Sequence, residues 1–345
     1  MLRNSMSCLS VLAVISVWGA LPALGDDGAA SVGVGGIQLI REPRVSMEEE
    51  RLTISATQIT VEFDFLNDTD KDITTEVAFP VPPYDRKFLD ASYPKGLDDF
   101  RLWIDGRETK YQIDARAMLK GVDYSALLRK LGVDVASLGH FTDNDPKRGV
   151  PYSPDVEKLS DAQREDLKRL GLIRSDNGFM GWTVVKRYHW TQTFPAHKAL
   201  HVRHTYSPIL GFGMLQPEVS DPVPRREKTP EFAAAIRDSC IDAPLQNTLT
   251  AAAQKEKEDN GYILSEWVDY ILTTANTWKT PIKSFELVVE RPEPTTPTKD
   301  EPGRHWLVSF CWDGPVEQLD ANRFLARASD LVPSRELHVA FFGVH

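Results

Sequence analysis

Apolar and polar side chains alternate along much of this chain, which predicts β-strands. From Trp182 to Trp190 the even-numbered positions are mostly large and apolar while the odd-numbered ones are mostly polar, and the alternation returns from Leu200 to Tyr206. A period of two residues is typical of a strand with one face on a core. We therefore predict two strands that fold back as a hairpin around Ala196 and His197.

Two earlier stretches repeat this pattern. Apolar residues alternate from Ile59 to Phe65 and again from Ile73 to Phe79, on either side of the turn at 67–70, which predicts a second hairpin. Phe100 to Ile104 leads into Asp105-Gly106, a strong signal for a tight turn. We expect a returning strand at Tyr111 and Ile113, and we interpret Ser46 to Arg51 as a polar turn.

The region from about 115 to 180 interrupts the β pattern. Asp123 to Leu131 predicts a short amphipathic helix. Ser160 and Gln163 form a capping box that begins another helix, and Gly171 is its natural end. We interpret this region as a helical insertion, either a lid over a binding surface or a cover for an open end of the sheet.

The last third of the chain mixes helices and strands. Residues 208–230 contain five prolines and predict a linker. A helix should begin at Thr229-Pro230 and carry Cys240. We expect a further helix at about 245–257, and alternation predicts four more strands, near 268–272, 285–289, 306–312 and 337–341.

These elements predict a mainly β fold in two parts. The first is an antiparallel β-sandwich domain at 26–215 that contains the helical insertion at about 115–180. The second is an α+β domain at 216–345, with helices followed by antiparallel strands. The length of 345 residues and the hydrophobic content of 41% are sufficient for both cores.

The N-terminus predicts export. Arg3 supplies a positive charge, Cys8 to Ala20 is a short apolar run, and Ala23 and Gly25 are small residues at the positions that a signal peptidase requires. We predict that residues 1–25 are a cleavable signal peptide and that the protein is periplasmic. No later run approaches the ~20 apolar residues of a membrane span, so we expect no integral membrane protein after cleavage.

Removal of the signal leaves two cysteines, Cys240 and Cys311. In an oxidising compartment such a pair is most simply a disulfide. Closing a loop of about 70 residues would stabilise the fold by roughly 4 kcal/mol in the chain-entropy model. The alternative is a catalytic thiol, although no neighbouring histidine arrangement supports a nucleophile.

The predicted hairpin gathers basic residues on its polar face. Arg187, His189, His201 and Arg203 share that face, whereas His204 points into the core. We take these four residues as a candidate surface that binds an anion or makes a pH-dependent contact; the alternative is a solvated basic face. Strand alternation separates the histidines, and the acidic turn at 68–72 lacks the glycine and glutamate of a calcium loop, so the sequence predicts no metal site.

The net charge and the missing sequence motifs argue against several classes of function. A net charge of −10 argues against nucleic-acid binding. Nucleophile-elbow, zinc-protease and phosphate-loop motifs are missing from the sequence, which predicts no cofactor. We expect a non-enzymatic binding or structural module of the cell envelope, with an envelope protein or a glycan as its partner. The alternative is a periplasmic hydrolase of a glycan or envelope polymer, which requires two convergent carboxylates in a cleft.

Four stretches beside the signal peptide carry a resemblance to known sequences. They are ITVEFDFLNDTDKDITTEVAFPVP, YHWTQTFPAHKALHVRHTYSP, YILTTANTWKTPIKSFELVVE and VSFCWDG. Together they resemble an exported bacterial family, domain of unknown function 4424. The family's second signature falls on Tyr270, Leu272, Trp278, Pro281, Ile282 and Phe285. The resemblance covers nearly the whole mature chain and places Cys240 and Cys311 at the family's cysteine positions. It implies no particular activity.

Overall fold

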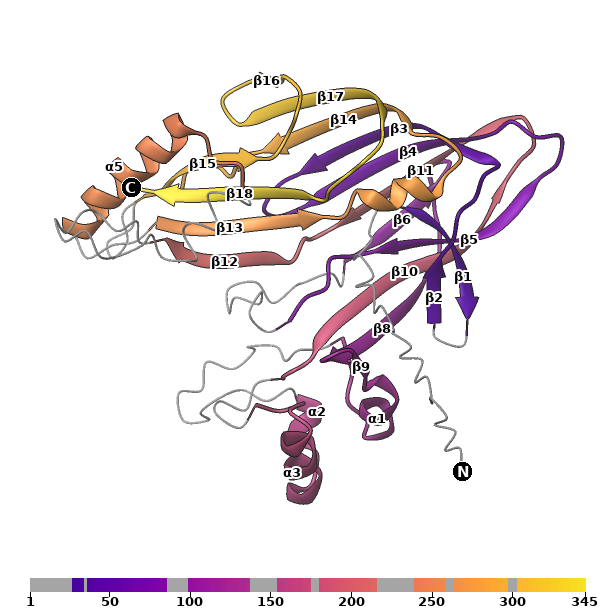
Figure 1. Ribbon diagram of the computed structural model, residues 1–345, viewed down its shortest axis with the longest axis horizontal. Helices are drawn as coiled ribbons and strands as arrows, with labels where there is room; N and C mark the ends of the chain where they lie inside the picture. Colours follow the sequence, from indigo (N-terminus) through magenta and orange to yellow (C-terminus); the bar gives the residue numbers. More distant parts are fainter. Residues whose placement is uncertain are drawn as a thin grey trace, which may run out of the picture.

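Three β-sheets form most of the protein in the computed structural model (Figure 1). The structure describes residues 27–33, 36–85, 99–136, 154–174, 180–215, 239–258, 263–296 and 303–345. The sheets have six, eight and four strands, in the orders β2-β1-β5-β10-β8-β9, β16-β17-β14-β3-β4-β11-β6-β7 and β12-β13-β18-β15. Every strand pair is antiparallel except β3 with β14, which run parallel. The mainly β prediction is therefore confirmed.

The strands of the six-stranded sheet are β1 (Gly28–Gly33), β2 (Gly36–Leu39), β5 (Ile73–Pro80), β8 (Gln112–Leu119), β9 (Val122–Asp123) and β10 (Thr183–Phe194). Those of the eight-stranded sheet are β3 (Val45–Ile54), β4 (Ile59–Asn67), β6 (Arg101–Ile104), β7 (Arg107–Glu108), β11 (Lys198–Tyr206), β14 (Ile282–Glu290), β16 (Val316–Gln318) and β17 (Arg323–Leu331). The four-stranded sheet consists of β12 (Leu210–Leu215), β13 (Ile263–Tyr270), β15 (His305–Phe310) and β18 (Leu337–Val344).

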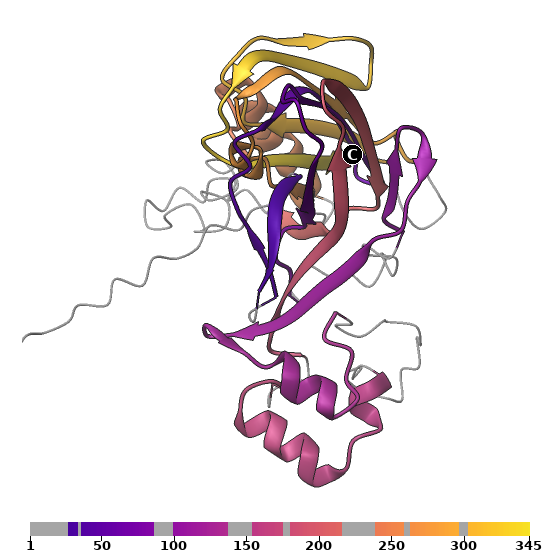
Figure 2. The ribbon, with the colours of Figure 1, turned by 90° about the vertical axis from the view of Figure 1, so that its right-hand side faces the viewer.

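Of the helices in the described residues, only α5 (Ala243–Glu258) is longer than nine residues. The others are α1 (Ser125–Lys130), α2 (Pro154–Glu157), α3 (Asp161–Arg169) and the 3-10 helix η2 (Thr273–Thr277). Both side-chain bonds of the predicted capping box at Ser160 are present at the start of α3. Helices α1 to α3 gather beyond the ends of β8 and β10 (Figures 1 and 2). Within the described residues no helix is long and apolar enough to cross a membrane.

One face of the eight-stranded sheet packs against both other sheets. The ring of Phe65 on β4 lies 5.6 Å from that of Phe194 on β10, which belongs to the six-stranded sheet. Farther along, the Tyr270 hydroxyl on β13 of the four-stranded sheet lies 3.4 Å from Glu50 on β3. The buried side chains from all three sheets form one continuous core. Helix α5 covers the opposite face of the four-stranded sheet through Leu249.

Two adjacent corners carry the chain between the six-stranded and eight-stranded sheets. One corner joins β4 to β5 and the other joins β10 to β11. The buried side-chain amide of Asn67 donates to the carbonyl oxygens of Lys71 at 2.9 Å and Phe194 at 2.8 Å, so it holds both corners. Asp72 accepts a hydrogen bond from the backbone N–H of Ala196 across the same contact. The corners therefore support each other.

The two predicted hairpins are wrong because both pairs of strands separate at these corners. β10 pairs with β5 and β8, whereas β11 pairs with β4 and β6. The tight turn at Asp105-Gly106 is present, and both residues have positive φ. Its returning strand is β7, while the strand with Ile113 is β8 of another sheet. The expected polar turn at Ser46 to Arg51 is part of strand β3.

A separate α+β domain is not seen in the described residues, which corrects that part of the predicted fold class. Strands β14 and β17 come from the last third of the chain but lie in the same sheet as β3 and β4. Helix α5 matches the helix expected at about 245–257. Residues 216–238, which hold most of the predicted linker and the helix expected at Thr229, lie outside the described residues, and Cys240 lies in a turn. The region of the predicted insertion begins within strand β8, and the helix expected at Asp123 to Leu131 is present as α1.

We expect Asn67→Ala to lower the free energy of unfolding by about 2–4 kcal/mol, since it removes the donor to the Phe194 carbonyl in the buried corner, a donor to Lys71 and the acceptor of two hydrogen bonds from Thr69. Urea unfolding followed by tryptophan fluorescence measures this loss. Asn276→Ala is the matched control, because exposed Asn276 donates a single hydrogen bond, to Pro333, and should cost less than about 1 kcal/mol. Equal losses in the two variants would contradict the role of Asn67.

Candidate functional site

The outer face of the six-stranded sheet holds Arg187 and His189. Register places Arg187 opposite Asp114 of β8, and the guanidinium Nη1 lies 3.7 Å from Oδ2 of that carboxylate. His189 Nδ1 lies 2.5 Å from Glu76 Oε1, and the other oxygen of Glu76 accepts from Thr191 at 2.9 Å. Both predicted residues are thus engaged with carboxylates of neighbouring strands.

The outer face of the eight-stranded sheet holds His201 and Arg203. His201 Nδ1 lies 2.8 Å from Asp64 Oδ1 on β4. Arg203 Nε lies 3.6 Å from Glu62 Oε1, and its guanidinium lies 5.1 Å from the ring centre of Trp103 on β6. Arg101 contacts the same ring at 4.8 Å, so one indole is held by two guanidinium groups.

A row of alternating charge crosses this second face, which we call the charge row. Register places its members side by side on successive strands. From β17 to β7 they are Arg327, Glu286, Arg51, Glu62, Arg203, Trp103 and Glu108. Arg327 Nε lies 3.1 Å from Glu286 Oε2 and Arg51 Nε lies 3.4 Å from Glu62 Oε2. Opposite charges on adjacent strands stabilise an exposed sheet, and they leave the row nearly neutral.

The structure therefore divides the predicted binding surface into two. Arg187 and His189 lie on one sheet and His201 and Arg203 on another, since the hairpin that would have joined them does not form. Sequence reasoning missed the partners from other strands: Glu76, Asp114 and Arg116 on the first face, and Glu62, Asp64 and Trp103 on the second. These partners could be found only from the register between strands, and the periodicity of a single strand carries no information about register.

His204 lies in the core, as expected from strand alternation. Its Nε2 lies 3.4 Å from Oδ2 of Asp27, and neither side chain is exposed to solvent. The imidazole packs against the aromatic rings of Phe63, Phe79, Phe100 and Trp190. Burial raises the pKa of Asp27, although the neighbouring imidazole acts in the opposite direction.

A shallow pocket lies where the ends of the three sheets meet. Its volume is about 30 Å³, and its lining is Ile59, Val81, Pro82, Pro83, Tyr84, Tyr206, Pro208, Ile209, Gly211 and Asp269. Asp269 Oδ1 lies 2.6 Å from His338 Nδ1 at this end of the four-stranded sheet. Cofactor and substrate pockets typically measure about 300–1,000 Å³, so this pocket is too small to enclose such a molecule.

The acidic turn serves as an anchor for other segments. Asp68 pairs with Lys279 at 2.5 Å, Asp70 with His197 at 2.9 Å, and Asp72 with the backbone of Ala196. The hydrogen bond from Lys279 lowers the pKa of Asp68. Within the parts of the chain that the structure describes, no three metal-binding side chains form a group that could hold an ion.

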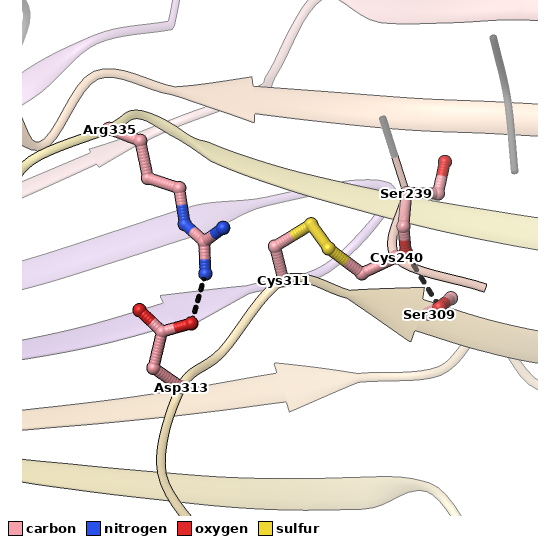
Figure 3. The surroundings of a disulfide bond; sticks show 6 residues. All are labelled: Ser239, Cys240, Ser309, Cys311, Asp313 and Arg335. Carbon is pink, nitrogen blue, oxygen red and sulfur yellow. Dashed lines mark hydrogen bonds and ion pairs between the residues drawn. A yellow bond between two sulfur atoms is a disulfide. The ribbon is translucent and has the colours of Figure 1, made fainter. Parts of the chain in front are cut away.

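Cys240 and Cys311 form a disulfide bond (Figure 3), with Cα atoms 5.1 Å apart and a sequence separation of 71. Beside it, Ser309 Oγ donates to the carbonyl of Ser239 at 2.7 Å, and Arg335 pairs with Asp313 at 2.7 Å. The bond ties the segment before α5 to the end of the edge strand β15, so it fixes the helix against its sheet.

Comparison with known proteins shows a family and distant structural likenesses. The family model described as "Domain of unknown function (DUF4424)" matches residues 25–340. No curated protein matches the chain in sequence. A crystal structure titled as a "putative nutrient binding protein" from Legionella pneumophila subsp. pneumophila str. Philadelphia 1 is 14% identical, with a TM-score of 0.41 over 92% of this chain and 71% of that one. A likeness at this level says nothing about function.

Asp27 predicts a pH dependence of stability. The pKa of Asp27 is raised above 3.8 in the folded protein, so the folded protein holds this proton more tightly than the unfolded chain does. The resulting contribution to the free energy of unfolding is fully present below the pKa of the unfolded chain and is lost as pH rises through the pKa of the folded protein. Asp27→Asn should therefore gain about 1 kcal/mol or more relative to wild type between pH 4 and pH 8. Urea unfolding at both pH values measures this, with exposed Asp313→Asn as control; a difference that does not change with pH contradicts the prediction.

Loss of the disulfide should lower the free energy of unfolding by about 4 kcal/mol, since the unfolded chain regains the freedom of a long loop. Urea unfolding of Cys240→Ser/Cys311→Ser and of wild type under reducing conditions should give the same loss. The double variant should not respond to reductant. Alkylation of both thiols in the unreduced protein, detected by intact mass, would overturn the pairing.

Proposed function

The chain belongs to the family described as "Domain of unknown function (DUF4424)", and we propose that it is an exported, non-enzymatic binding or structural module of the cell envelope. The observation that carries this proposal is the position of the polar residues that sequence reasoning selected. They lie on the outer faces of two sheets, among cross-strand ion pairs. Open sheet faces of this kind suit contact with another extended surface, such as an envelope protein or a glycan.

Export and the periplasm belong to the same proposal. The signal-like sequence lies in residues 1–25, outside the described residues. The disulfide between Cys240 and Cys311 supports an oxidising compartment, because thiols in the cytosol are kept reduced. These two observations together support the proposed envelope location.

The alternative, a periplasmic hydrolase of a glycan or envelope polymer, has less support. Such an enzyme needs a carboxylic acid of raised pKa that its substrate can reach. Among the described carboxyl groups, a raised pKa is found for Asp27, which is completely buried in the core. The carboxylates that gather near His201 and Arg203 contact Arg51 and lie on an open sheet face.

A photo-crosslinking residue at Thr60 tests the proposal in the native envelope. Thr60 lies on the outer face between Thr53 and Thr205 of the neighbouring strands, so a bound envelope component should be captured there. The control position is Leu170 at the end of α3, which is 44% exposed and distant from this face. We expect an adduct with one defined envelope component at Thr60 and none at Leu170.

The outcomes separate the two hypotheses. The same adducts at both positions, or none at either, would contradict a binding face on the eight-stranded sheet. Release of soluble fragments when the purified protein is incubated with isolated peptidoglycan would favour the hydrolase instead.

A further inference from the structure

The outer face of the six-stranded sheet brings two arginines to one carboxylate. Arg187 is opposite Asp114 in the β8–β10 register, and Arg116 follows two residues later on the same face of β8. Arg116 Nε lies 3.2 Å from Asp114 Oδ2 and Arg187 Nη1 lies 3.7 Å from the same oxygen. The backbone N–H of Ile37 on β2 reaches this oxygen too, at 3.4 Å. One carboxylate oxygen thus serves three donors.

The surrounding ionisable groups leave these two arginines with an excess of positive charge. His189 is occupied by Glu76 at one end of the face. At the other end, Asp123 accepts from the backbone and hydroxyl of Ser125, while Arg129 donates to the carbonyl of Ala115. The carboxylates of Glu76 and Asp123 are thus engaged elsewhere, with His189 and Ser125. Arg116 and Arg187 therefore share the carboxylate of Asp114.

Arg187 is the less well satisfied of the pair. Its side chain is 24% exposed, and its buried Nε has no hydrogen-bond acceptor among the described residues. Burial lowers the pKa of Arg187; Asp114 opposes this effect and the like charge of Arg116 adds to it. A guanidinium group presents a fork of donors that fits the oxygens of phosphate and carboxylate groups, and here part of that fork has no partner within the described chain.

The charge row on the eight-stranded sheet provides the contrast. There Arg327 has Glu286 at 3.1 Å, and Glu108 at the other end of the row pairs with Arg101 at 2.9 Å. Arg51 contacts three carboxylates. Burial acts to lower the pKa of Arg51, but the hydrogen bonds and charges of Glu49, Glu62 and Asp64 together outweigh it and raise this pKa. In the charge row, Arg51 and Arg203 contact different oxygens of Glu62, whereas Arg116 and Arg187 share a single oxygen of Asp114.

We propose that Arg187 and Arg116 form a binding site for an oxyanion, the phosphate or carboxylate group of an anionic envelope polymer. The anion would approach the exposed side of the Arg187 guanidinium and share the two arginines with Asp114. The polymer as its source rests on the proposed function, whereas the site itself rests on the charge and geometry of this face.

Thermal unfolding of the full chain tests the site with inorganic phosphate, with glucuronate, and with sodium chloride at equal ionic strength. A ligand that binds only the folded state raises its melting temperature, and we expect a rise of about 3 °C at saturation over the chloride reference. A rise with phosphate alone identifies a phosphate source, a rise with glucuronate alone a carboxylate source, and a rise with both the shared oxyanion chemistry. No rise with either overturns the site.

Four variants separate the site from general charge effects. Arg187→Gln and Arg116→Gln should lose the rise, while Arg327→Gln, from the charge row, should keep it. Asp114→Asn removes the competing carboxylate and should lower the half-saturating anion concentration about fivefold. Because Asp114→Asn should increase the affinity for the anion, it still tests the proposal if an arginine variant does not fold. Wild-type behaviour in every variant would overturn the proposal, and the crosslinking at Thr60 remains an independent test of envelope binding.

Discussion

The side-chain amide of Asn67 fixes the relationship between the two largest sheets. A strand that leaves one sheet must cross the core edge before it joins the next, and its backbone groups lose their ladder partners there. Asn67 supplies hydrogen bonds to two such crossings, at Lys71 and Phe194. Because β4 and β11 pair directly, the corner that holds Phe194 also sets the register of the strand that follows it. This contact therefore helps to determine which side chains lie side by side on both outer faces.

The three sheets share one continuous core, so side chains that could bind a ligand must lie outside it. The inner face of the eight-stranded sheet meets apolar partners along its length, and His204 is enclosed there by aromatic rings with Asp27. Ionisable groups that a ligand could reach are therefore on the outer faces. Each face must neutralise its own charges across strands, and the two faces do this to different degrees. In the charge row arginines and glutamates alternate, while on the other face Arg116 and Arg187 share one oxygen of Asp114.

Strand alternation predicted which residues lie in the core and which lie outside, but not which strands pair. Val202 and His204 face the core and His201 and Arg203 face outward, as the period indicated. The turn at Asp105-Gly106, the capping box at Ser160 and the helix α5 were predicted from local signals too. Strand β3 was missed because the register shifts between Met47 and Glu49, which interrupts its alternation. The pairing of Arg187 with Asp114 depends on a contact between strands about 70 residues apart, and sequence periodicity carries no such information.

The net charge of −10 bears on how an anion could be recognised. At long range a chain of this net charge repels a polyanion or attracts it only weakly, since exposed charges are screened beyond about 8–10 Å in physiological salt. Recognition of a polyanion by this protein must therefore depend on short-range contacts at a local excess of positive charge. Two arginines that share Asp114 on a half-buried face supply such an excess, whereas the charge row, which spans a wider area, does not. Of the four basic residues that the sequence marked, Arg187 thus combines partial burial, a like-charged neighbour and an incomplete set of partners.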